Sequence, residues 1–101
     1  MKEYELYVPL HTNDGDSIPP DRLNGLKRRL VARFGGLTHF PQKNEGLWKI
    51  GGTTFRDEIV ILRVLADEKE ADEYFRLLKK ELQTEWHQQA VLVVARPVET
   101  I

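Results

Sequence analysis

The chain has 101 residues, a length that predicts one domain with a single modest core. Its formal net charge is −1, so it has no overall basic field of the kind that holds a nucleic acid backbone or an anionic membrane. It contains no cysteine, which excludes disulfides, thiolate nucleophiles, Cys-based zinc sites and iron–sulfur clusters.

The first segment, residues 2–10, has the alternating pattern of a half-buried strand. Its apolar face carries Tyr4, Leu6, Val8 and Leu10. Tyr7 and two glutamates occupy the other face. Because this start has no long apolar run, we expect no signal peptide, no membrane span and a cytoplasmic location.

A polar loop over residues 11–17 precedes a predicted helix that ends near residue 34. Proline fits its first turn, where a missing backbone N–H costs nothing, and Asp21 lies near the positive end of the helix dipole. The buried stripe of this helix consists of Leu23, Leu26, Leu30 and Phe34. The glycine pair 35–36 ends it, because glycine tolerates the left-handed conformation of a C-cap.

The middle of the chain predicts a β-hairpin. Residues 37–40 and 47–50 have strand composition and are interrupted by the segment PQKNEG. A glycine turn at residues 51–52 then leads into a long β-rich strand over residues 53–66.

The last part predicts a second helix and a final strand. Asp67 and Glu70 form a D-x-x-E capping pattern, and the stripe that follows consists of Ala71, Phe75, Leu78 and Leu82. Residues 90–98 are apolar on both faces, so we expect this strand to lie in the centre of the sheet.

The element order β-α-β-β-α-β is typical of the ferredoxin-like α+β fold. Right-handed crossovers would place both helices on one face of a four-stranded antiparallel sheet. We expect residues 1–101 to form this single domain, with the first and last strands in the middle of the sheet.

The opposite, open face of the sheet is expected to be apolar. On the third strand Val60, Leu62 and Val64 would face the helices. The residues expected to point away, and to form a dimer interface, are Ile59, Ile61 and Leu65. With Tyr7 and one apolar set of the last strand they form a surface that a second copy or a ligand would cover.

Candidate site residues gather around the glycine-rich stretch 33–58. A carboxylate beside an arginine and a histidine can serve acid–base chemistry, which makes His39, Arg56 and Glu58 the candidate catalytic residues. Trp48 and Tyr7 are candidates for ligand contacts, although a hairpin tryptophan is more often a packing residue.

Strand parity limits this hypothesis. Arg56 and Glu58 have the parity of the helix-facing residues, so a shared site needs an irregularity between Phe55 and Ile59. Without one, the two charges lie at the end of the sheet and form ion pairs there.

No motif predicts a cofactor or a metal. The three histidines have no i, i+4 spacing, and the glycines form neither a dinucleotide fingerprint nor a phosphate loop. The central strands lack the aromatic pattern of an RNA-recognition motif, so we expect no nucleic acid partner.

The ordered segments RFGGLT, GLW, RDEIVILRVL and HQQAVLVVARPV resemble a family of small bacterial domains of unknown function. The matching positions are Arg33, Phe34, Gly36, Leu37, Thr38, Gly46, Trp48, Glu58, Gln88, Ala90, Val91 and Leu92. The resemblance implies the ferredoxin-like fold and its hairpin, and it implies no activity.

Three hypotheses about function follow. The first is a domain without a catalytic motif that homodimerises through its open sheet face. The second is a cofactor-free small-molecule-binding protein or enzyme of the dimeric α+β barrel type. The third is an accessory subunit of a larger complex.

Overall fold

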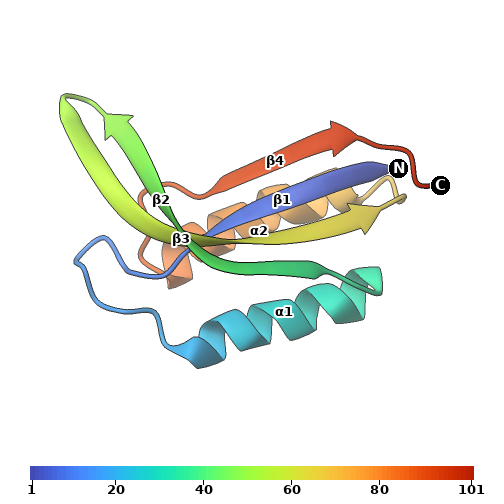
Figure 1. The fold of residues 1–101 in the computed structure, drawn as a ribbon, viewed down its shortest axis with the longest axis horizontal. Coiled ribbons are helices and arrows are strands. Elements are labelled where there is room, and N and C mark those ends of the chain that lie inside the picture. The colour runs from blue at the N-terminus through green and yellow to red at the C-terminus, as the bar shows by residue number, and fades with distance from the viewer.

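The computed structural model describes the whole chain from Met1 to Ile101 and has the predicted element order. The elements are β1 (Lys2–Pro9), α1 (Pro20–Phe34), β2 (Thr38–Ile50), β3 (Thr53–Ala66), α2 (Ala71–Glu85) and β4 (Leu92–Pro97). The strands form one antiparallel sheet in the order β2-β3-β1-β4, and both helices cover the same face of it (Figure 1). The ferredoxin-like α+β fold expected from the sequence is confirmed.

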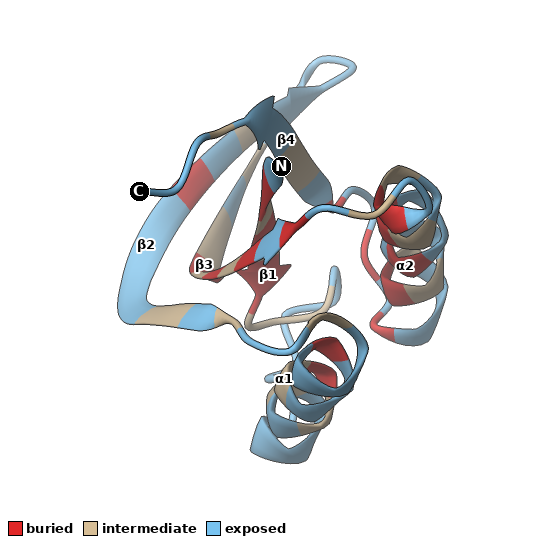
Figure 2. Cartoon of the chain, turned by 90° about the vertical axis from the view of Figure 1, so that its right-hand side faces the viewer, coloured by how far each residue is buried: buried red, intermediate tan, exposed pale blue.

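The core lies between the sheet and the two helices (Figure 2). On β1, Leu6 pairs with Leu62 of β3, and both side chains are fully buried against the helices. The predicted stripes supply the other layer, with Leu26 and Leu30 from α1, and with Phe75, Leu78 and Leu82 from α2. Gly35 ends α1 with a φ of 86°, the left-handed cap that glycine accepts without strain.

The expected position of the last strand is wrong. β4 pairs only with β1 and lies at an edge of the sheet, so the two central strands are β1 and β3. Apolar side chains on both faces of a strand indicate that both faces are covered. The place of the strand in the sheet depends instead on backbone pairing at its two edges. Arg96 and Pro97 at the end of β4 are residue types that edge strands tolerate.

The open face of the sheet carries a charge network as well as apolar residues. Glu3, whose side chain is only 11% exposed, pairs with Arg63 at 3.3 Å and with Arg96 at 3.0 Å. Arg96 also reaches Glu5 at 2.9 Å. The expectation of a mainly apolar face overlooked these pairs, because the glutamates of β1 share the face of Tyr7.

The three expected interface residues differ in exposure. Ile59 is 5% exposed, so the chain itself covers it and leaves little of it for a partner. Ile61 is half-buried, and Leu65 is 44% exposed. Of the three, Leu65 presents the largest share of its side chain on the surface.

The β2–β3 hairpin extends well beyond the rest of the sheet (Figure 1). β1 pairs with β3 only as far as Pro9 and Ile59, while β2 and β3 stay paired to Ile50 and Thr53. The irregularity between Phe55 and Ile59 that a shared site would need is absent. The register shifts on β2 instead, between Phe40 and Asn44. Pro41 explains the choice of strand, since it has no N–H to donate to the ladder.

Tyr4 ties the sheet to α2, because its hydroxyl donates a hydrogen bond to Asp72 Oδ1. Burial, together with this bond, raises the pKa of Tyr4 to about 12. In the unfolded chain the phenol titrates near 10, so its contribution to stability is complete below that pH and is lost as the pH rises towards 12.

We therefore expect Tyr4→Phe to flatten the alkaline loss of stability, measured as the free energy of unfolding in denaturant between about pH 8 and about pH 12. Tyr74→Phe serves as the control and should keep the slope of the parent. Identical slopes for the parent and Tyr4→Phe would contradict the assignment.

Candidate functional site

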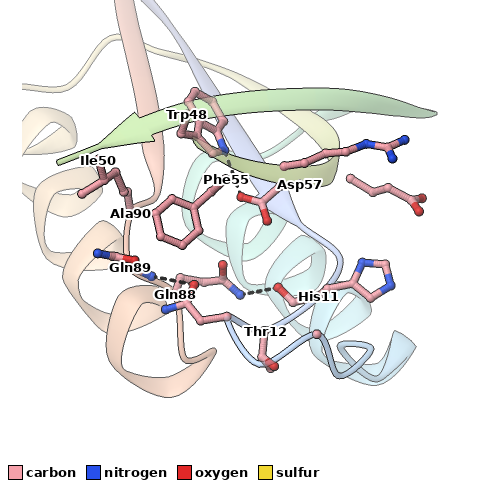
Figure 3. A pocket seen from close by; sticks show the side chains of 13 residues that line it. His11, Thr12, Trp48, Ile50, Phe55, Asp57, Gln88, Gln89 and Ala90 are labelled. Atoms are coloured by element: carbon pink, nitrogen blue, oxygen red, sulfur yellow. Dashed lines mark hydrogen bonds between the residues drawn. The ribbon is translucent and has the colours of Figure 1, made fainter. Parts of the chain in front are cut away.

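A cavity of about 330 Å³ lies where the projecting hairpin meets two loops of the sheet body (Figure 3). The hairpin supplies one wall, residues 11–15 after β1 supply another, and residues 88–90 before β4 close the third side. Its volume falls within the range of about 300–1,000 Å³ that is usual for small-molecule sites.

Trp48 and Phe55 form the aromatic wall of the cavity. They are directly paired across β2 and β3, so their side chains lie on the same side of the hairpin. The indole Nε1 of Trp48 donates to Asp57 Oδ2 at 2.9 Å, which fixes both side chains (Figure 3). The ring lies over the buried Gly46, where an added Cβ would come within 2.9 Å of Trp48 Cζ2.

Gln88 forms the opposite side of the cavity and locks the two loops together. Its side chain is buried, and its Nε2 donates to the backbone oxygens of His11 at 2.7 Å and Trp86 at 2.9 Å. Asn13 adds two further links, since its N–H donates to His87 O and its Oδ1 accepts from Gln89 N–H. His87 has a φ of 50°, a costly conformation for a residue with a Cβ, directly before Gln88.

The charged residues of the cavity are Arg56, Asp57 and Glu58. Arg56 forms an ion pair with Glu45 at 3.1 Å, and Glu58 lies 3.8 Å from Lys43. Both pairs join the strands of the hairpin. Asp57 forms no ion pair, and its only hydrogen-bond partner in the chain is Trp48.

The structure does not bring the three candidate catalytic residues together. His39 pairs with Leu62 in the sheet and faces α1, where its Nδ1 lies 3.5 Å from Lys27 Nζ. Burial, and secondarily the charge of Lys27, lowers the pKa of His39. Arg56 and Glu58 line the cavity at the hairpin, whereas His39 is not one of the residues that line it.

Of the two expected ligand contacts, Trp48 lines the cavity and Tyr7 does not. The Tyr7 hydroxyl donates to Glu5 at 3.3 Å on the open face, and burial raises its pKa. The sequence hypothesis missed Asp57 and Gln88. Asp57 is two residues after Phe55, the cross-strand partner of Trp48, so its side chain lies on the same face of β3. This alternation is the one sequence signal that pointed to Asp57.

Two further features bear on ligand classes. No three His, Asp or Glu side chains are grouped so that they could hold a metal ion. No helix combines the length and the apolar character needed to cross a membrane.

No family model matches the chain, and no curated protein does. Solved structures do share its fold. A phage SAM (S-adenosylmethionine) lyase in the apo state matches with a TM-score of 0.67 at 17% identity, over 94% of this chain and 78% of that one. A phage SAM lyase in complex with S-methyl-5′-thioadenosine matches with a TM-score of 0.66 at 14% identity, over 94% and 79%.

The divalent cation tolerance protein CutA1 from Thermus thermophilus matches with a TM-score of 0.64 at 16% identity, over 99% of this chain and 86% of that one. At these identities the likeness shows the fold. The likeness to an enzyme over nearly the whole chain overturns the first hypothesis, that of an unassigned domain without a catalytic motif whose role is to homodimerise.

The contact between Gly46 and Trp48 makes a prediction about the aromatic wall. We expect Gly46→Ala to displace the indole, because the new methyl group would occupy its place, and to break the bond to Asp57. The cost should be about 1 kcal/mol or more in the free energy of unfolding, with a shift in tryptophan emission. Thermal and denaturant unfolding followed by fluorescence measure both effects.

Gly52→Ala is the matched control, since it lies in the same hairpin and an added Cβ there meets no atom within 4 Å. It should leave stability within about 0.5 kcal/mol of the parent. Equal effects of the two substitutions would show that the glycine does not position the indole.

Proposed function

We propose that this chain binds a small nucleoside of the S-adenosylmethionine type in the cavity at the base of the hairpin. The observation that carries the proposal is the rigid aromatic wall of Trp48 and Phe55, set opposite the polar side formed by Gln88. A flat base stacks on such a wall, while its polar edge and the sugar need hydrogen-bonding groups.

The comparisons support the choice of ligand. One of the structures that share the fold is a phage SAM lyase bound to S-methyl-5′-thioadenosine, a nucleoside of this type. The size of the cavity suits such a molecule, and the loops that enclose it are held by four hydrogen bonds in which Gln88 or Asn13 takes part. A site whose groups are fixed before binding loses less entropy when the ligand arrives.

We expect S-adenosylmethionine or S-methyl-5′-thioadenosine to bind and to quench the fluorescence of the half-buried Trp48. Trp48→Ala should weaken binding by about 5- to 100-fold, since stacking of one base is worth about 1–3 kcal/mol. Isothermal titration calorimetry gives the affinities. Chromatography of the nucleosides after incubation with S-adenosylmethionine distinguishes turnover from binding alone.

Leu47→Ala is the matched control, because Leu47 is the neighbouring residue, is 60% exposed and does not line the cavity. It should bind as the parent does. If no nucleoside binds the parent at millimolar concentration, or if both variants bind as the parent does, the proposed site is wrong.

The expected homodimer and the expected cytoplasmic location stay predictions. Four leucines on the surface are more than a third exposed, namely Leu47, Leu65, Leu77 and Leu92. Single exposed leucines are ordinary, but Leu65 and Leu92 pair with Glu3 and Tyr7 and so lie together on the open face of the sheet, which supports the prediction of a dimer through that face. Sedimentation equilibrium at about 10 μM should therefore give the mass of a dimer, and a monomer at that concentration would contradict the prediction.

A further inference from the structure

The inference concerns the charge of the ligand, and it rests on the proposed function. The hydrogen-bonding groups deepest in the cavity are restricted in what they can offer a ligand. Gln88 is only 7% exposed, and its Nε2 donates to two backbone oxygens, those of His11 and Trp86. Because both of those partners are acceptors, the side-chain amide cannot turn over. Its oxygen therefore stays on the side of the cavity and accepts no hydrogen bond from the chain (Figure 3).

Across the cavity, the carboxylate of Asp57 also has an oxygen that accepts no hydrogen bond from the chain. Its Oδ2 receives the indole N–H of Trp48, while its Oδ1 receives no bond from the chain. It has no partner of opposite charge, whereas both neighbours in the strand have one, Arg56 in Glu45 and Glu58 in Lys43. The half-buried carboxylate thus presents a negative charge that the fold leaves uncompensated.

The side-chain donors of Trp48 and Gln88 are already used. The indole N–H of Trp48 is taken by Asp57, and the amide hydrogens of Gln88 are taken by the backbone. Free amide hydrogens remain only on Asn13 and Gln89, both exposed at the rim. The Thr12 hydroxyl and the Arg56 guanidinium also line the cavity, but the charge of Arg56 is paired with Glu45. Beside Gln88 and Asp57 a ligand therefore meets acceptors, an unpaired negative charge and two aromatic faces.

We infer that the cavity selects a positively charged nucleoside over its neutral counterpart, with Asp57 as the charge partner and Gln88 as the acceptor of an N–H group. A sulfonium centre is the cation that a nucleoside of the S-adenosylmethionine type carries. The faces of Trp48 and Phe55 favour the same charge, because the ring quadrupole attracts cations. An exocyclic amine or an ammonium group supplies the N–H that Gln88 accepts.

The test compares two ligands that differ at the sulfur. S-adenosylmethionine carries the methylated, cationic sulfur, and S-adenosylhomocysteine carries the neutral thioether, while base, sugar and amino acid are the same. Calorimetry on the parent should give an affinity at least about tenfold higher for the cationic ligand, the effect of a hydrogen-bonded or closely placed charge. Asp57→Asn should bring the ratio close to one, mainly through weaker binding of the cation.

Asn at position 57 keeps an oxygen that can accept from Trp48, so the substitution changes the charge and preserves the shape. The matched control is Asp21→Asn, which removes a carboxylate on α1 away from the cavity and should keep the ratio of the parent. Circular dichroism checks that each variant is folded. If Asp57→Asn does not fold, the ratio measured on the parent still decides.

The two proposals fail in different ways. If neither ligand binds the parent, the proposed function is wrong and the inference falls with it. If both ligands bind the parent equally well, or if Asp57→Asn keeps the preference for the cation, the nucleoside site stands and the charge selection by Asp57 is wrong.

Discussion

The pairing of β1 with β3 is the constraint on which the rest of the structure depends. It sets Tyr4, Leu6 and Val8 against Val64, Leu62 and Val60 and so aligns the core residues of the two central strands on one face. It also ends early, because the last backbone bond between these segments runs from Leu10 N–H to Glu58 O. Beyond that bond β3 has only β2 as a neighbour, and the chain after β1 turns away as a loop. The cavity lies between the projecting β2–β3 hairpin and this loop.

A two-stranded ribbon is marginally stable by itself, so the projecting hairpin needs contacts of its own. The Trp48–Phe55 pair and the bond from Trp48 to Asp57 provide them on the cavity side. The ion pairs of Arg56 with Glu45 and of Glu58 with Lys43 also cross between the strands. Exposed ion pairs of this kind contribute little individually, which makes the aromatic pair the main support of the hairpin. The same side chains thus hold the hairpin and form the wall of the site.

The sequence predicts most of the fold, because the apolar periodicity of both helices and of β1 and β3 directly reflects which side chains are buried. It does not predict which strand lies at the edge. Apolar residues on both faces of β4 are compatible with either position, and only backbone pairing decides. The register shift on β2 was also hidden, since PQKNEG contains a proline and reads as an interruption although the strand continues through it with two additional residues.

The candidate site was only partly predictable from the sequence, because contacts between residues far apart in the chain position part of it. Trp48 stood out as a large aromatic residue in a glycine-rich hairpin, and it does line the cavity. His39 was grouped with Arg56 and Glu58 because they are near in sequence, but it lies before the register shift and faces α1. Gln88 could not be found in this way. Its role depends on contacts with His11, which is 77 residues away in the chain and comes close only in the folded protein.

Two carboxylates on the same side of the sheet show what burial demands of a charge. Glu3 is the more buried, and it is neutralised by both Arg63 and Arg96, so the fold alone satisfies it. Asp57 is half-buried and has an indole N–H and no cation. A neutral molecule that filled the cavity would remove water from this carboxylate without replacing it, which costs free energy. A cation would compensate the charge as it excluded the water. The contrast between Glu3 and Asp57 is therefore the physical reason to expect that the missing partner of Asp57 comes from the ligand.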